Sequence, residues 1–187
     1  MFNRDFTTDE LEFLTKQSTY KNQGNTTSTN KYVLTHPVMA ELNKFVESCI
    51  GIYFQDIYAP QNKTSMRITQ SWLNYSKTGE WHHRHSHPNS FISGVFYINA
   101  NKDADKIYFY KNEYKQLDIP TANLNPFNAS SWWLPVETKK LLLFPSSLTH
   151  SVDPVEASDT RISLAFNTFP VGYLGQEESL TALHLGN

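Results

Sequence analysis

From residue 64 onward the chain is a succession of short segments with the composition of β-strands, and this succession restricts the fold more than any other feature. β-branched and aromatic residues recur within each segment, and Gly, Pro, Asn and Asp fall between segments. The segments are SMRITQSWLNY, SFISGVFYIN, KIYFYKN, KKLLLFPSS and TRISLAFNTF, with a histidine-rich stretch between the first two. Because no helical pattern separates them, we expect antiparallel pairing and a mainly β sandwich or barrel.

The first part of the chain has helical patterns instead. In FTTDELEFLTKQ, Thr7 and Glu10 have the spacing of a capping box, which predicts a short helix. A longer helix is predicted to begin near Pro37 and to end at Gly51. Its apolar stripe consists of Val38, Met39, Leu42, Phe45, Val46, Cys49 and Ile50. The polar stretch 21–31 between the two helices predicts a surface loop.

Length suggests one domain that is large enough to bury a core of its own. We expect a single domain over residues 1–187. Within it, residues 1–60 form a helical support and residues 64–170 form the β core.

Charge and hydropathy exclude several kinds of partner. The formal net charge is -2 and the pI is about 6.4, so the chain offers no basic field to nucleic acid. No apolar run is long enough to cross a membrane, and MFNRDFTTDE lacks the apolar core of a signal peptide. The single cysteine excludes an internal disulfide and fits a reducing compartment. We therefore expect a cytoplasmic protein, located in the host cytoplasm if a phage encodes it.

A histidine cluster follows the first strand, in the sequence GEWHHRHSHPNS. If this stretch is extended, His83, His85 and His87 lie on one face. His82 then points to the opposite face. Pro88 disfavours helical geometry at the preceding residue and so favours an extended His87. Imidazoles at alternate positions of a strand can reach one ion, so the spacing predicts a metal site.

The strand TRISLAFN has two faces of different character. The apolar row is Ile162, Leu164 and Phe166, and the polar row is Arg161, Ser163 and Asn167. We expect the apolar row to pack under the N-terminal helices. A polar row inside a barrel needs a polar partner, so the second row predicts a bound ligand.

The order of these residues resembles a known superfamily. His150 lies 63 residues after His87, and Arg161 follows 11 residues later. A histidine pair, a distant histidine and then a basic residue resemble the motif order of the 2-oxoglutarate- and Fe(II)-dependent oxygenases. SGVFYIN resembles the T-x-x-x-Y-L-N strand of prolyl hydroxylase-like members, and NYSKTGEW resembles their NY and G-x-(Y/W) motifs. The phrases GEWHHRHSHPNSFISGVFYI and RISLAFN also resemble a less characterised branch of bacteria and phages.

This resemblance covers about half of the chain and implies both a fold and a chemistry. The fold is a double-stranded β-helix, also called a jelly roll or cupin-like barrel, with the N-terminal helices packed on its major sheet. The chemistry uses Fe(II), 2-oxoglutarate and O2. Arginine at the position of Arg161 binds the distal carboxylate of 2-oxoglutarate in the superfamily. The residues implied to lie at the cosubstrate are Arg161, Ser163, Tyr97, Ser93 and Tyr75.

The chain departs from the superfamily at one metal ligand. The usual carboxylate two residues after the first histidine is missing, because Arg84, His85, His87 and Asn89 occupy those positions. One interpretation is an all-histidine triad of His85, His87 and His150. In the other, His83 and His85 bind the ion and His87 only supports them. We prefer the first, because the branch that the chain resembles keeps H-x-H-P here.

Two other functions remain open at this point. A three-histidine cupin-type thiol dioxygenase needs no 2-oxoglutarate, and a cupin-like metal-binding module needs no reaction. Both leave Arg161 and the tyrosines without a role. The sequence does not name the substrate, which is a peptide or a small molecule, and a prolyl residue is the first candidate by resemblance alone. The segment from Asn112 to Leu134 is long for a barrel connection and is predicted to form a substrate wall or lid.

Overall fold

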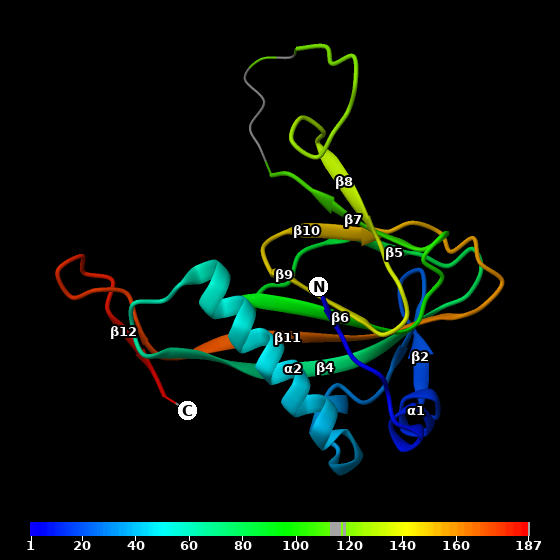
Figure 1. The fold of residues 1–187 in the computed structure, drawn as a ribbon, viewed down its shortest axis with the longest axis horizontal. Helices are drawn as coiled ribbons and strands as arrows, with labels where there is room; N and C mark the ends of the chain where they lie inside the picture. The colour runs from blue at the N-terminus through cyan, green and yellow to red at the C-terminus, as the bar shows by residue number, and fades with distance from the viewer. Residues whose placement is uncertain (113–116, 118, 187) are drawn as a thin grey trace.

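The computed structural model describes residues 1–112, 117 and 119–186. Two antiparallel sheets face each other, and the helices cover the outer face of the larger one (Figure 1). The larger sheet consists, in spatial order, of β1 (Phe2–Asn3), β9 (Lys140–Pro145), β6 (Ile92–Asn99), β11 (Arg161–Leu174), β4 (Thr64–Ser76), β3 (Thr26–Ser28) and β2 (Thr19–Lys21), with β12 (Leu183–Leu185) paired to β11. The smaller sheet consists of β5 (His82–His85), β10 (Thr149–Val152), β7 (Lys106–Tyr110) and β8 (Ser131–Pro135). This arrangement confirms the mainly β prediction.

Strand β11 is the centre of the larger sheet. It pairs with β4 along its length, from Arg161 opposite Ser76 to Gly172 opposite Thr64, and with β6 on its other side. The core strands β4 to β11 extend from Thr64 to Leu174, close to the predicted range. Side chains therefore alternate between the helix-covered face and the space between the sheets.

The two predicted helices form, and one ends later than expected. Helix α1 (Thr8–Thr15) begins with the predicted capping box of Thr7 and Glu10. Helix α2 (Ala40–Tyr53) does not end at Gly51 but continues into a π-helical turn over Phe54–Tyr58. A helical glycine costs only about 1 kcal/mol, and the buried Ile50 and Phe54 hold the helix on the sheet beyond it. The turn before α2, at Pro37–Met39, leaves Val38 exposed, so this member of the predicted stripe is not in the core.

Two apolar layers result from the alternation. The first lies between the helices and the larger sheet and contains the predicted row of β11, with Leu164 and Phe166 fully buried. The second lies between the sheets and contains Val95, Ile107 and Phe144. Polar residues of β11 share this second space, so the site is built between the sheets.

Two predicted loops contain strands. Residues 21–31 belong to a hairpin of β2 and β3, which adds to the edge of β4 with Thr26 opposite Tyr75. Residues 1–60 are therefore not only helical, because an exposed strand edge recruits backbone partners from a polar segment. The segment 112–134 contains most of β8, where Trp133 lies opposite Tyr108 of β7.

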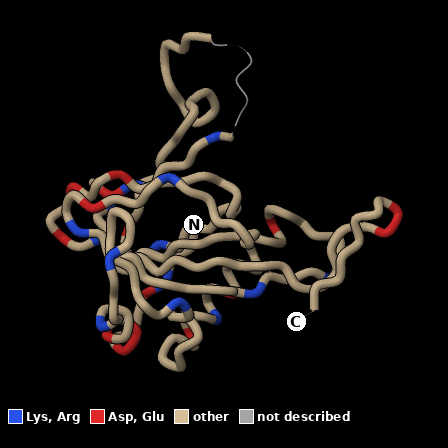
Figure 2. Tube along the Cα trace, turned by 180° about the vertical axis from the view of Figure 1, so that it is seen from behind, with Lys and Arg blue, Asp and Glu red and all other residues tan. Residues whose placement is uncertain are grey.

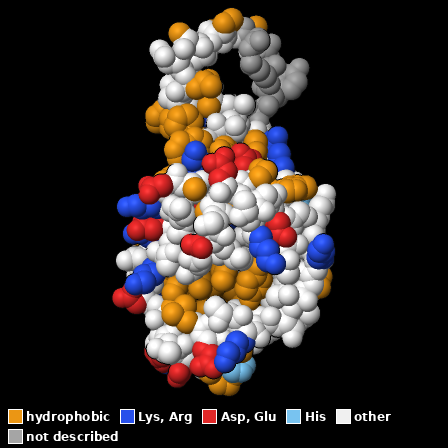
Figure 3. Space-filling model, turned by 90° about the vertical axis from the view of Figure 1, so that its right-hand side faces the viewer, with side chains coloured by type: hydrophobic (Ala, Val, Ile, Leu, Met, Phe, Trp, Pro, Cys, Tyr) orange, Lys and Arg blue, Asp and Glu red, His pale blue; other side chains and the backbone are white. Residues whose placement is uncertain are grey.

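The described residues in the remainder of the predicted wall or lid project from the body of the molecule (Figure 3). Residues 113–116 and 118 of that prediction lie outside the described residues. The described part carries strongly exposed apolar side chains, among them Leu117, Leu124 and Phe127. Acidic and basic residues are interspersed along the trace (Figure 2). Among the described residues, no helix is both long and apolar enough to cross a membrane.

Candidate metal and cosubstrate site

A small cavity between the two sheets collects most of the predicted site residues. It is lined by β4, β6 and β11 of the larger sheet and by the histidine segment and β10 of the smaller sheet. The predicted residues that line it are His85, His87, His150, Arg161, Tyr97 and Ser163. Its volume is about 50 Å³.

Strand pairing brings the three predicted ligands together. His150 of β10 lies directly opposite His85 of β5, and their ring centroids are 4.3 Å apart. His87 follows β5 and places its Nε2 3.1 Å from Nε2 of His85. One nitrogen of each of the three rings lies within 4.8 Å of the others.

The other ring nitrogens are held by oxygen acceptors. Nδ1 of His85 donates to the carbonyl of His83 at 2.7 Å, and Nδ1 of His150 donates to the carbonyl of Leu148 at 3.0 Å. Nδ1 of His87 donates to Oδ1 of Asn167 at 2.6 Å. Because a carbonyl only accepts, Nδ1 carries the proton in His85 and His150, and Nε2 presents a lone pair to the cavity.

These lone pairs fit a metal ion. Two Nε2 lone pairs that face each other at 3.1 Å repel unless a cation lies between them. Ligands about 2.1 Å from an ion and at right angles to each other are about 3 Å apart, which matches this separation. Both groups of metal-ligating side chains found in the described residues consist of histidines only. One of these groups is His85, His87 and His150, the set of the first interpretation, and the other contains His83 and His85.

Burial keeps these imidazoles neutral, as ligation requires. Desolvation, together with the charges of the neighbouring histidines, lowers the pKa of His150 to about 3, although its hydrogen bond to Leu148 acts in the opposite direction. Desolvation also lowers the pKa of His85 and of His87. The three Nε2 lone pairs are therefore available at neutral pH.

Strand β5 contains a bulge that changes the predicted faces of the cluster. His150 is opposite His85, but Val152 is opposite His82, so three steps on β5 match two on β10. The prediction that His82 points away is wrong, because the extra residue turns its ring into the cavity. His83 instead lines the outer surface, beside Trp81.

Arg161 lies at the other end of the cavity, with its side chain only 6% exposed. Its Nη2 donates to Oγ of Ser76 at 3.2 Å, and its Nη1 is 3.9 Å from Oδ1 of Asp105. A guanidinium has five N–H donors, and the described hydrogen bonds of its side chain use one of them. Desolvation raises the pKa of the buried Tyr97, so its hydroxyl remains a donor beside Arg161. This end of the cavity is suited to a carboxylate.

Two predicted cosubstrate residues lie elsewhere. Tyr75 points into the layer under the helices, where its hydroxyl donates to the carbonyl of Leu14 at 2.8 Å. The prediction that Tyr75 lies near the metal is therefore wrong, because alternation along β4 turns it to the other face. Ser93 is fully buried, and its Oγ lies 2.8 Å from Nδ1 of His87 and 2.9 Å from Oδ1 of Asn167. It orients His87 rather than facing the cavity.

Asn74 is a cavity residue that the sequence analysis missed. It is 8% exposed and lines the cavity opposite Ser163. Its Oδ1 has no hydrogen-bond partner among the described residues, although buried amides are normally paired. The alternation of side chains along the strand could have indicated it. Leu73 and Tyr75 flank Asn74 and lie on the helix-covered face, so Asn74 has to lie on the opposite face.

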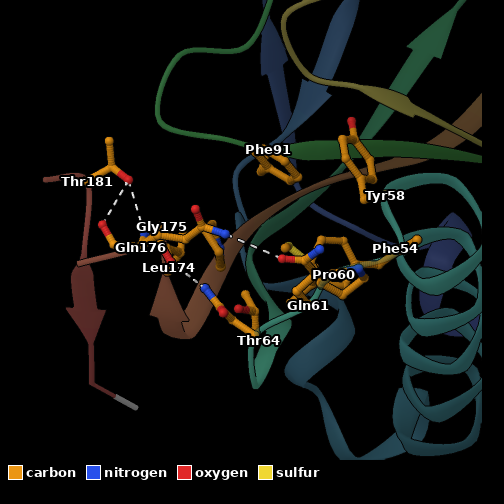
Figure 4. A pocket seen from close by; sticks show the side chains of 14 residues that line it. Phe54, Tyr58, Pro60, Gln61, Thr64, Phe91, Leu174, Gly175, Gln176 and Thr181 are labelled. Atoms are coloured by element: carbon orange, nitrogen blue, oxygen red, sulfur yellow. Dashed lines mark hydrogen bonds between the residues drawn. The ribbon is translucent and has the colours of Figure 1, made fainter. Parts of the chain in front are cut away.

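A second, larger hollow of about 530 Å³ lies at the end of α2 (Figure 4). Phe54, Tyr58 and Phe91 face it, together with polar residues of the chain after β11. Its lining has neither charged residues nor histidines, so it offers no imidazole or carboxylate ligands for a metal ion.

A β-barrel with three convergent histidines and a buried arginine defines a metal-dependent oxygenase that uses an acidic cosubstrate. The profile of the family described as "Putative 2OG-Fe(II) oxygenase" matches residues 70–167. The match covers more than half of the chain, so the chain belongs to this family and is a 2-oxoglutarate- and Fe(II)-dependent oxygenase. No curated protein sequence matches the chain.

Solved structures share the fold at low sequence identity. An oxidoreductase of the 2OG-Fe(II) oxygenase family from Burkholderia pseudomallei has a TM-score of 0.60 and 11% identity, over 84% of this chain and 74% of that chain. HygX from Streptomyces hygroscopicus, with nickel, 2-oxoglutarate and hygromycin B bound, has a TM-score of 0.58 and 11% identity, over 88% and 79%. A prolyl hydroxylase from Trichoplax adhaerens, in complex with a peptide of hypoxia inducible factor, has a TM-score of 0.54 and 16% identity, over 86% and 74%. The double-stranded β-helix prediction is thereby confirmed.

Proposed function

We propose that this protein is a dioxygenase that hydroxylates a C–H bond of its substrate, with Fe(II) held by His85, His87 and His150. The observation that carries the proposal is the composition of one cavity. Three neutral imidazoles converge at one end, and a buried guanidinium with unused donors lies at the other. A dicarboxylate with a keto group beside one carboxylate needs both ends at once.

Each residue has a defined task in this proposal. The three histidines hold the metal ion, with Asn167 and Ser93 fixing the ring of His87. When bound, Fe(II) supplies the oxidative chemistry, in which decarboxylation of 2-oxoglutarate is coupled to transfer of oxygen from O2 to the substrate. An all-histidine set adds no negative charge, so the site is one charge more positive than the common two-histidine, one-carboxylate set.

The chain's other residues bind and orient the cosubstrate. Arg161 is proposed to pair with its distal carboxylate through two parallel hydrogen bonds, assisted by the hydroxyl of Tyr97. Ser163 and Asn74 line the path between this pair and the histidines. The cavity holds about 50 Å³, less than the space of two waters at about 30 Å³ each, so lining side chains are proposed to move when the cosubstrate binds. Trp72 and Val152 line it while only partly buried, which gives them room to move.

The substrate is proposed to be a peptide, with a prolyl residue as the first candidate. The likeness to a prolyl hydroxylase solved with a peptide supports this class, whereas the likeness to HygX supports a small molecule. A thiol dioxygenase or a metal-binding module would give Arg161 and Tyr97 no ligand to bind, so the cavity supports neither.

One titration tests the proposal. Fe(II) is added to the metal-free protein without oxygen, 2-oxoglutarate is titrated in, and the visible spectrum is searched for a weak metal-to-ligand charge-transfer band. The band is expected, and admission of O2 should convert 2-oxoglutarate to succinate. Bound iron without the band would refute the cosubstrate assignment and favour the thiol dioxygenase. A panel of prolyl peptides, analysed by mass for a gain of one oxygen, then tests the substrate class.

A further inference from the structure

A second histidine group lies next to the first and overlaps it. His82, His83 and His85 each present a ring nitrogen within 4.8 Å of the other two. His85 belongs to both groups. The bulge in β5 creates this arrangement, because it turns the adjacent His82 and His83 toward the same neighbour. The ring of His82 stacks on that of His85, with centroids 4.6 Å apart.

This second group connects the inner cavity to the surface. An outer cleft of about 320 Å³ is lined by Trp81, His82, His83, Arg84 and the residues 151–154. His82 and Val152 line both the outer cleft and the inner cavity, so they form the wall between them. A solute that enters from the cleft meets His83 and His82 before it reaches His150, which is 6% exposed.

The ring of His83 is not held in the way that the three rings of the first group are. Each Nδ1 of His85, His87 and His150 has an oxygen acceptor. Nδ1 of His83 is buried, and no hydrogen-bond partner for it is found among the described residues. A buried nitrogen without a partner is costly, and a bound cation would satisfy it. The cleft also contains the cationic Arg84. Its guanidinium lies over the ring of Tyr110, 3.9 Å from the ring centroid, and this contact partly offsets its positive charge.

We propose that His82 and His83, together with His85, form a loading position at which a divalent metal ion binds before it moves to His85, His87 and His150. The inference rests on the proposed metal triad. A hydrated ion cannot enter a cavity of about 50 Å³ without losing water. A loading position lets it exchange waters for imidazoles one at a time, while the shared His85 stays bound during the transfer.

Loading kinetics provide the first test. Co(II) is mixed with the metal-free full-length protein without oxygen, and its absorption bands are followed in time and at equilibrium. The His82→Ala/His83→Ala variant should load about 10- to 100-fold more slowly while its equilibrium affinity stays within about threefold of the parent's. The matched control is His36→Ala/His184→Ala, which removes two histidines outside both groups and should load as the parent does. Loading of the His82/His83 variant at the parent rate would overturn the proposal.

Equilibrium binding provides the second test. A His87→Ala/His150→Ala variant keeps the loading position and should bind one Co(II), more than about 100-fold more weakly than the parent. Adding His85→Ala should abolish this residual binding. Absence of residual binding in the folded double variant would also overturn the loading position. A parent that binds no Co(II) would instead refute the metal triad, so the two failures are distinguishable.

Discussion

Removal of the Arg161 guanidinium should weaken 2-oxoglutarate binding strongly and leave iron binding almost unchanged. Its side chain is 6% exposed, and its described hydrogen bonds use only one of five N–H donors, the one to Ser76. A bidentate pair with the cosubstrate carboxylate would therefore be buried. Breaking such a pair costs about 3 to 5 kcal/mol, because it leaves a charge buried without a partner. At about 1.4 kcal/mol per tenfold, Arg161→Ala should raise the Kd by roughly two to four orders of magnitude.

The same substitution also affects folding, so the assay needs a second variant. Asp105 is buried 3.9 Å from the guanidinium and loses its countercharge in Arg161→Ala. Arg161→Lys keeps the charge but not the two parallel hydrogen bonds, and it should recover only part of the affinity. Arg67→Ala is the matched control, because Arg67 lies on the neighbouring β4 but is exposed.

The measurement is a titration of 2-oxoglutarate into anaerobic Fe(II) protein, followed by the charge-transfer band. Thermal unfolding reports the folded fraction of each variant, and a separate Fe(II) titration reports metal affinity. If folded Arg161→Ala binds 2-oxoglutarate within about threefold of the parent, the arginine is structural and its assignment is refuted.

Four further outcomes are expected. His150→Ala should lose stoichiometric Fe(II) in equilibrium dialysis because the triad loses a ligand, and retained iron would show that the ligand set is misassigned. His87→Asp should keep Fe(II) by restoring the common carboxylate triad. If the His87→Asp variant loses iron while a His87→Ala variant keeps it, His87 is not a ligand. Tyr97→Phe should weaken 2-oxoglutarate binding by about 0.5 to 1.5 kcal/mol, the value of one hydrogen bond, and an unchanged Kd would remove the tyrosine from the site. Finally, the pKa of His150 is about 3 when folded against 6.5 ordinarily, so the unfolded chain binds more protons between these values. Burial lowers the pKa of His82 to about 3 as well. Between pH 6.5 and about 3 the metal-free protein should therefore lose at least about 1.4 kcal/mol of unfolding free energy per pH unit, and pH-independent denaturant unfolding over pH 4.5–6.5 would contradict this.

The helix ends and the strand series show how far local patterns reach. The capping box of Thr7 and Glu10 forms as predicted because both partners lie within one turn. The prediction that the helix ends at Gly51 was wrong. Burial of Phe54 against the sheet stabilises the helical conformation beyond Gly51, and this outweighs the weak preference of glycine against helix. The hairpin of β2 and β3 was missed because its stability comes from the edge of β4, far along the chain.

The site shows the same division. The sequence by itself limited the candidate metal ligands to His83, His85, His87 and His150, and it showed that Arg161 follows them, because spacing and residue type carry that information. Only the tertiary structure decided which side chains face the cavity. A bulge in β5 turned His82 inward, and the pairing of β4 placed Asn74 rather than Tyr75 beside the cavity.

The physical reason is the period of two along a strand. A change of one residue in register moves a side chain to the opposite face, and register is fixed by the partner strands and by the layer that each face covers. The surroundings of Arg161 depend on the same distant pairing. Ser76 and Asp105 flank it from positions 85 and 56 residues earlier in the chain, a proximity that only the folded sheets create.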